Sequence, residues 1–177
     1  MGGQRHILLC GERGVGKSTL IEKLLQACPR PRYGFLTRME APGPDGFRPV
    51  YLHPAGEPRE RWTFPEEACV GVCDSRTHRP NLEVFNTLGV SCIEAARPGG
   101  ILVMDELGFF EARAEGFTAA VLRALDGDIP VLAAVKARYD VPFLNAVRAH
   151  PRAEVFPITA ENRDELFYRL LPRLRSL

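Results

Sequence analysis

The sequence predicts a three-layer α/β/α domain with a mostly parallel sheet and an added β-hairpin after the first helix. A short apolar run at 6–10 is followed at once by a glycine-rich loop and then by a helical pattern. From residue 101 onward, apolar runs of strand length alternate with helical patterns, which is typical of parallel strands joined by crossover helices. The chain has 177 residues, enough for one substantial core, so we interpret 1–177 as a single domain.

The glycine-rich loop is the most specific motif in the chain. Residues 11–18 are GERGVGKS, which fits the pattern G-x-x-x-x-G-K-[ST] of a phosphate-binding loop, or P-loop. Glycines let backbone N–H groups point inward at the phosphates of a nucleotide, and the following helix presents the positive end of its dipole. We expect Lys17 to reach the β- and γ-phosphates and Ser18 to ligate Mg²⁺. The predicted nucleotide-binding residues of this segment are Gly11, Glu12, Arg13, Gly14, Val15, Gly16, Lys17, Ser18 and Thr19.

The added hairpin follows the first helix, which we expect at 19–27. Residues 33–40 and 47–52 have a β-like composition and flank a turn rich in proline and glycine. The next stretch, 53–80, is irregular and rich in proline and arginine, and we expect a single short strand in it, at 62–64. A connection this long in a compact domain is often functional.

The second half of the chain is more regular. Asn81 is expected to cap a helix that extends to Ala96 and ends at the Pro-Gly-Gly run 98–100. The patterns after it predict strands at 101–104, 129–135 and 154–158, and helices at about 114–125, 142–149 and 161–174.

A second chemical motif follows the apolar residues 101–104. Asp105 is placed to hold the hydration shell of Mg²⁺ together with Ser18, as the acidic residue of a Walker B strand does. Glu106 comes next and could polarise an attacking water as general base. Paired carboxylates are common at solvated strand ends, so it is the upstream P-loop that favours the functional interpretation.

Composition argues against several other classes of protein and of site. The formal net charge is +1 and the basic residues are scattered, so we expect no binding to nucleic acid or to a membrane surface. The 5 cysteines include no C-x-x-C pair, which disfavours a zinc site or a disulfide framework. We find neither a signal-peptide pattern nor an apolar run long enough to span a membrane, and expect a cytoplasmic protein. Its protein partners cannot be inferred from these features.

Several runs together resemble one known family. The chain is similar to the small nucleoside-triphosphatases of archaea, bacteria and animals over nearly its whole length. The matching runs are the P-loop, 34–38 (GFLTR), 81–85 (NLEVF), 105–111 (DELGFFE), 130–132 (PVL) and 158–163 (ITAENR). The resemblance implies Mg²⁺-dependent, slow hydrolysis of ATP, GTP and other nucleoside triphosphates to the diphosphate and phosphate. The family usually has Pro where this chain has Arg13, and Thr where it has Ser18, which still offers a hydroxyl ligand. It also has a basic, glycine-containing stretch where this chain has 73–80.

Other candidate residues have structural alternatives. Asn162 and Arg163 follow the last predicted strand and are candidates for contacting the nucleobase or ribose, although Asn162 could instead cap the final helix. Glu111 is a candidate for orienting water, or a carboxylate at a helix start. The candidates for an additional cation at the γ-phosphate are Arg13, Arg76, Arg79, Arg138 and Lys136. Trp62 is expected to serve packing rather than base stacking.

Two other functions are compatible with the same motifs. One is a nucleotide or small-metabolite kinase, in which 53–80 would close over an acceptor. The other is a nucleotide-controlled binding module in which slow turnover makes the bound state the signal. Nothing in the chain matches the Asn-Lys-x-Asp pattern that reads guanine, so we expect loose base selectivity.

Overall fold

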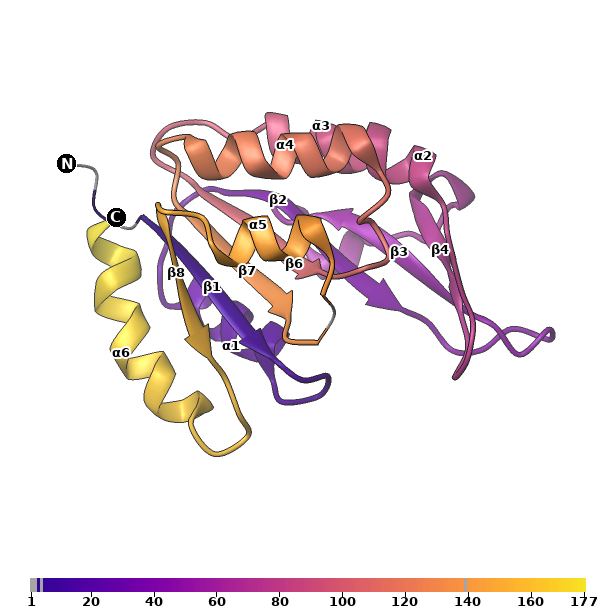
Figure 1. The fold of residues 1–177 in the computed structure, drawn as a ribbon, viewed down its shortest axis with the longest axis horizontal. Coiled ribbons are helices and arrows are strands. Elements are labelled where there is room, and N and C mark those ends of the chain that lie inside the picture. Colours follow the sequence, from indigo (N-terminus) through magenta and orange to yellow (C-terminus); the bar gives the residue numbers. More distant parts are fainter. Residues whose placement is uncertain (1–2, 4, 139) are drawn as a thin grey trace.

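The computed structural model describes residues 3, 5–138 and 140–177 and shows the expected α/β/α architecture (Figure 1). One sheet of 8 strands has the order β5-β4-β3-β2-β6-β7-β1-β8. Its strands are β1 His6–Gly11, β2 Arg32–Met39, β3 Arg48–Pro54, β4 Cys69–Cys73, β5 His78–Pro80, β6 Ile101–Leu107, β7 Val131–Lys136 and β8 Ala153–Pro157. The helices are α1 Lys17–Gln26, α2 Leu82–Val84, α3 Val90–Glu94, α4 Glu115–Asp126, α5 Pro142–Arg148 and α6 Arg163–Ser176. A π-helical turn, Phe85–Gly89, joins α2 to α3, and two 3₁₀ turns lie at Arg59–Arg61 and Glu66–Ala68.

The sheet has a parallel and an antiparallel part. Strands β2, β6, β7, β1 and β8 are mutually parallel, whereas β3, β4 and β5 continue from β2 in antiparallel order. Because parallel strands end at the same edge, the loop after β1 and the end of β6 lie on one side of the sheet. Strand β7 separates β1 from β6, so groups that meet there must span an intervening strand.

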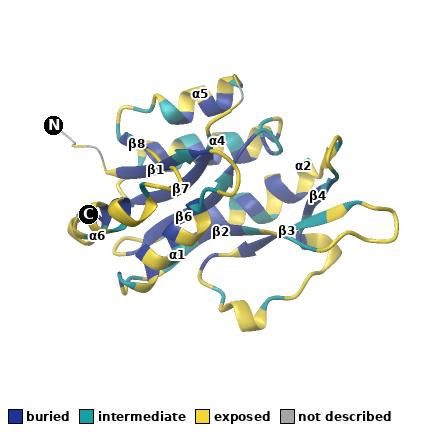
Figure 2. Cartoon of the chain, turned by 90° about the horizontal axis from the view of Figure 1, so that it is seen from below, coloured by how far each residue is buried: buried dark blue, intermediate teal, exposed yellow. Residues whose placement is uncertain are grey.

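Two hydrophobic cores cover the two faces of the sheet. Leu8 of β1 packs into the core under α2–α5, whereas its neighbours Ile7 and Leu9 pack against α1 and α6. This is the period-2 alternation expected of a strand that is buried on both faces. Figure 1 shows α5 in front of the parallel strands and α1 behind them, and Figure 2 shows the strands buried between the exposed outer faces of the helices.

The segment 53–80 corrects one sequence-based prediction. The strand expected at 62–64 is wrong, since these residues are irregular, and Trp62 stacks on His53 with ring centroids 4.1 Å apart. The strands here are instead β4 and β5, which extend the hairpin into a four-stranded antiparallel unit, β2–β5. Both lack a clear strand signal, because β4 has a central glycine and β5 is three residues long and contains a proline, which an edge strand tolerates.

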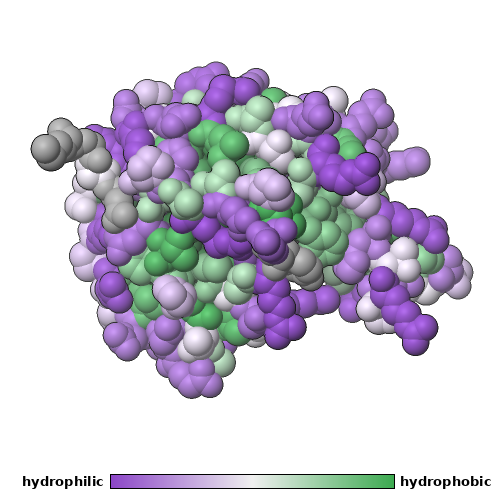
Figure 3. All heavy atoms as spheres, in the orientation of Figure 1, coloured by the Kyte–Doolittle hydropathy of each residue, from purple (hydrophilic) through white to green (hydrophobic). Residues whose placement is uncertain are grey.

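The surface is mixed in character. Polar side chains are spread over the face drawn in Figure 3, with smaller apolar areas between them. Among the helices of the described residues, none has the length and apolar content that crossing a membrane requires.

Candidate functional site

The P-loop joins β1 to α1 with the geometry that its sequence predicts. Gly14 and Gly16 have φ values of 81° and 103°, in the left-handed region that favours glycine, and Gly16 is the N-cap of α1. The side chain of Lys17 is buried, and its Nζ donates hydrogen bonds to the carbonyl oxygens of Gly11 (2.7 Å) and Glu12 (2.7 Å). The lysine is therefore held inside the loop, at the N-terminus of a 10-residue helix.

Ser18 and Asp105 meet across the intervening strand. Ser18 Oγ donates a hydrogen bond of 2.9 Å to Asp105 Oδ1, although the two residues are 87 positions apart in sequence. The hydroxyl of Thr37, from β2, donates to the main-chain oxygen of Asp105 at 3.0 Å. Burial of Asp105 raises its pKa to about 6, and the nearby Glu106 raises it further, against the effects of Ser18 and Lys17. The two predicted metal-binding residues are thus in direct contact.

Glu106 occupies a bulge in β6. Asp105 faces Ala134 of β7 and Leu107 faces Val135, which leaves Glu106 as the extra residue. Strand β6 continues to Leu107, three residues beyond its expected end, and the Asp105–Glu106 peptide is cis.

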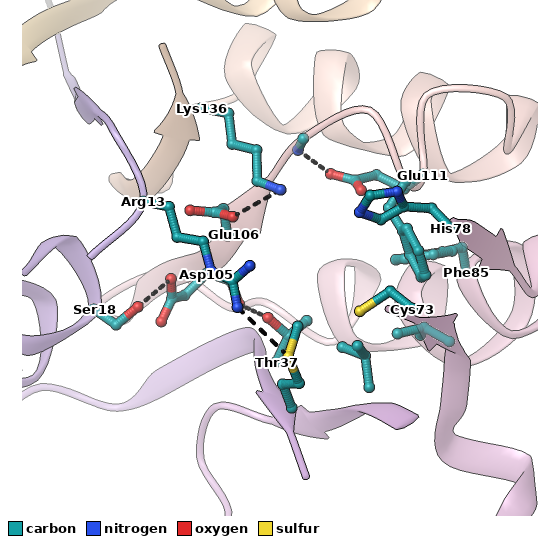
Figure 4. A pocket seen from close by; sticks show the side chains of 15 residues that line it. Arg13, Ser18, Thr37, Cys73, His78, Phe85, Asp105, Glu106, Glu111 and Lys136 are labelled. Carbon is teal, nitrogen blue, oxygen red and sulfur yellow. Dashed lines mark hydrogen bonds and ion pairs between the residues drawn. The ribbon is translucent and has the colours of Figure 1, made fainter. Parts of the chain in front are cut away.

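The bulge leaves the Glu106 carboxylate between two ammonium groups. Its Oε1 lies 3.5 Å from Lys136 Nζ, as Figure 4 shows. Its Oε2 lies 3.3 Å from Lys17 Nζ. The predicted general base is therefore next to the lysine assigned to the γ-phosphate, and Lys136 is the second cation at this position.

The donors at this site fit Mg²⁺ when a nucleotide completes the coordination. The described residues contain no group of three or more His, Cys, Asp or Glu side chains arranged to hold a metal. Mg²⁺ in nucleotide sites, however, keeps several waters and takes only one or two protein oxygens besides the phosphates. Ser18 Oγ and the Asp105 carboxylate, already 2.9 Å apart, are such a pair.

Asn162 and Arg163 follow β8, and their side chains have different contacts. Asn162 Oδ1 accepts from the N–H of Thr159 at 2.8 Å, and its Nδ2 donates to the carbonyl of Pro157 at 2.9 Å, so its amide holds the turn after β8. It is the N-cap of α6 by position, but its side chain makes no capping hydrogen bond. Arg163 packs on the loop, because a Cβ placed on Gly16 would lie 3.1 Å from Arg163 Nη1. Of the two, Arg163 is better placed to meet a nucleotide.

The candidate arginines separate into two groups. Arg13 Nη2 donates to Met39 Sδ at 3.6 Å, which links the P-loop to β2 beside Asp105. Arg138 Nε pairs with Glu12 Oε1 at 2.9 Å on the exposed side of the loop.

Arg76 and Arg79 belong to the antiparallel unit instead. Arg76 follows β4, and Arg79 lies in β5 with its guanidinium 4.4 Å from the ring centroid of Phe47. Of the five candidate cations, Arg13 and Lys136 line the cavity beside Asp105.

Glu111 is a buried carboxyl group, with 2% of its surface exposed. It accepts a hydrogen bond from the backbone N–H of Gly108, and it lies four residues before α4 rather than in the first turn of that helix. Burial raises the pKa of Glu111 to about 7. The carboxyl group thus fixes the turn that follows Glu106.

We predict that the pH dependence of stability contains a contribution from Glu111. Its folded-state pKa of about 7 exceeds the ordinary value of 4.5, so its stabilising contribution is complete below pH 4.5 and is lost as pH rises through 7. A shift of this size corresponds to about 3 kcal/mol. The variant Glu111→Gln is neutral throughout, so its free energy of unfolding relative to wild type should rise by up to about 3 kcal/mol between about pH 5 and pH 8.5. Urea unfolding at several pH values measures this, and parallel curves for the two proteins would contradict it.

The structure also contains a feature that sequence reasoning missed. A cavity of about 270 Å³ opens beside Asp105 and Glu106 and extends between β2, β3, β4 and the turn after β6. Figure 4 shows Ser18, Asp105 and Glu106 toward one end of it, and Cys73, His78 and Phe85 toward the other. The run 34–38 in β2 matched the family in sequence and contains Thr37, but that match pointed to no role for it.

The chain is similar to known proteins over nearly its whole length. The family model described as NTPase matches residues 6–171. The chain is 30% identical to "Nucleoside-triphosphatase THEP1" of Thermotoga petrophila, covering 93% of this chain and 90% of that protein. It is 31% identical to "Cancer-related nucleoside-triphosphatase homolog" of Bos taurus, covering 97% of each. The crystal structure of THEP1 from Aquifex aeolicus has the same fold, with a TM-score of 0.74 at 22% identity over 96% of this chain and 98% of that one.

Proposed function

Because the chain belongs to the NTPase family, we propose that it hydrolyses the β–γ bond of ATP, GTP and other nucleoside triphosphates, slowly, with Mg²⁺ and with little base selectivity. The observation that carries this proposal is the convergence of the P-loop with β6. Ser18 contacts Asp105 at 2.9 Å, and Lys17 contacts Glu106 at 3.3 Å. These are the groups that triphosphate hydrolysis needs, brought together from segments far apart in sequence.

In this proposal each residue has one task. Backbone N–H groups of the P-loop and Lys17 bind the phosphates, where Lys17 exchanges its bonds to Gly11 and Glu12 for bonds to phosphate oxygens. Ser18 and Asp105 would hold Mg²⁺, which neutralises charge on the β- and γ-phosphate oxygens when it is bound. Glu106 accepts the proton of the attacking water.

We expect Asp105→Asn to raise the Mg²⁺ concentration needed for half-maximal activity by about tenfold or more, since a neutral amide is a poorer partner for the cation. The amide can still accept the hydrogen bond from Ser18, so the fold should be retained. A Mg²⁺ titration of the phosphate-release rate measures the change. Superimposable titrations of variant and wild type would remove Asp105 from the metal site.

We expect ATP and GTP to be hydrolysed with kcat/KM values within about tenfold of each other, a difference of about 1.4 kcal/mol. The reason is that the Asn162 amide is already engaged by Thr159 and Pro157, which leaves few groups near the P-loop to read a base. Steady-state phosphate release with each nucleotide tests this. A preference above about a thousandfold would reveal a dedicated base pocket.

We also propose a cytoplasmic location. All five cysteines, Cys10, Cys28, Cys69, Cys73 and Cys92, are free, which fits a reducing compartment.

A further inference from the structure

The cavity beside Asp105 lies on the γ-phosphate side of the P-loop. Arg163 packs against Gly16 on the side of β8, where we expect the nucleoside. Ser18, Asp105 and Glu106, the groups assigned to the metal and the nucleophile, form the wall of the cavity on the opposite side. A molecule in the cavity would therefore face the γ-phosphate rather than the base.

The cavity is larger and more apolar than a site for a water molecule requires. Its lining includes the apolar side chains of Val50, Val70, Phe85 and Phe110, from β3, β4, the π-helical turn and the turn after β6, together with Cys73 and His78. The rings of Phe85 and Phe110 stand at 78° with centroids 6.3 Å apart, which leaves ring faces and edges to contact an aromatic ligand. Hydrolysis by water requires none of these contacts.

Size and polarity define the ligand further. Small-molecule sites usually measure about 300–1,000 Å³, so a cavity of about 270 Å³ suits a single ring and not a second nucleotide. Ser18, Asp105, Glu106 and Lys136 gather toward one end of the cavity, which is where the hydroxyl of such a ligand would point, whereas His78 lies toward the other end (Figure 4).

We propose that this cavity is an acceptor site, and that the chain also transfers the γ-phosphoryl group to the hydroxyl of a small aromatic alcohol. The inference rests on the proposed function, because water and the alcohol would use the same γ-phosphate and the same base. The segment 53–80 supports it, since β4 and β5 contribute Val70 and His78 to the cavity.

The chemical step balances without any further reactant. The hydroxyl oxygen of the alcohol forms a bond to the γ-phosphorus, and the bond from that phosphorus to the β–γ bridging oxygen breaks, so the nucleoside diphosphate leaves with the electron pair. The hydroxyl proton passes to Glu106 and from there to solvent. The products are a phosphate monoester and a nucleoside diphosphate. When water takes the place of the alcohol, the same step is hydrolysis.

The test uses ATP labelled in the γ-phosphate, with Mg²⁺ and the full chain. Benzyl alcohol, 2-phenylethanol and 3-pyridylmethanol are the probes, and ethanol at the same concentration is the control that has the hydroxyl without the ring. We expect labelled phosphate monoester from at least one aromatic probe, at least about tenfold more than from ethanol. Label that appears only as free phosphate with every probe would overturn the acceptor site and leave the proposed function intact. The proposed function fails instead if no free phosphate is released when alcohol is absent.

Two substitutions of Val50 test whether the phosphoryl transfer takes place in the cavity. Val50→Phe places a larger side chain in the cavity and should lower the ratio of monoester to free phosphate by about tenfold or more. Val72→Phe is the matched control, because Val72 is also half-buried in the antiparallel unit but does not line the cavity. Thermal unfolding checks that both variants fold. Val50→Ala, which enlarges the site, should raise transfer to the larger 2-naphthalenemethanol, and equal ratios in all these variants and wild type would overturn the assignment.

Discussion

Replacing Lys17 with alanine is expected to lower kcat/KM for triphosphate hydrolysis by at least about 10³-fold, or about 4 kcal/mol. The Lys17 side chain lies inside the P-loop, where 5% of its surface is exposed. Its Nζ lies 3.3 Å from Glu106 Oε2. A charge-assisted hydrogen bond contributes about 1.5–3 kcal/mol, and this side chain would make such bonds to both the β- and the γ-phosphate. Nucleotide affinity should fall as well, because part of that interaction is already present in the ground state.

The matched control for this variant is Lys23→Ala. Lys23 lies on the same helix, is 56% exposed, and has a distant ion pair with Asp164 at 3.8 Å. It should retain the activity of wild type, since exposed pairs of this kind contribute little. Equal activity of Lys17→Ala and Lys23→Ala would show that the phosphates bind elsewhere.

The parts of the site that could be predicted from sequence are those defined by local chemistry. Gly11–Ser18 has a fixed spacing because one tight loop must bring glycines, a lysine and a hydroxyl to the same anion. The apolar run 101–104 predicts the strand that carries Asp105, and the parallel order of β1, β7 and β6 places this residue at the P-loop. Alternation of apolar residues between two cores explains why the layers of the fold could also be predicted.

The parts that could not be predicted depend on contacts between distant segments. Val50 and Val70 line the cavity only because β3 and β4 pair, and β4 carries a weak strand pattern around Gly71. The position of the Glu106 carboxylate depends on a bulge against β7, which no local pattern indicated. The place of Asn162 after β8 makes it a candidate base contact, but its amide holds the turn there.

Substitution of Glu106 can separate the proposed hydrolysis step from nucleotide binding. We expect Glu106→Gln to lower kcat by about 10²-fold or more, the usual scale for the loss of a general base, while nucleotide affinity changes little. The amide retains the size of the side chain, and its single oxygen can still accept a hydrogen bond from either Lys17 or Lys136, which lie 3.3 Å and 3.5 Å from the two carboxylate oxygens. It cannot take a proton from water.

Single-turnover hydrolysis and nucleotide titration measure the two effects of Glu106→Gln independently. Glu115→Gln, which neutralises an exposed carboxylate in the first turn of α4, is the control and should behave as wild type. If Glu106→Gln hydrolysed at the wild-type rate, the carboxylate would serve only to position the two lysines. Glu111, which also lines the cavity and is not assigned to the metal, would then be the residue to test as base. Burial raises the pKa of Glu111 to about 7, so if Glu111 were the base, kcat should rise with pH as its carboxyl group loses its proton near pH 7.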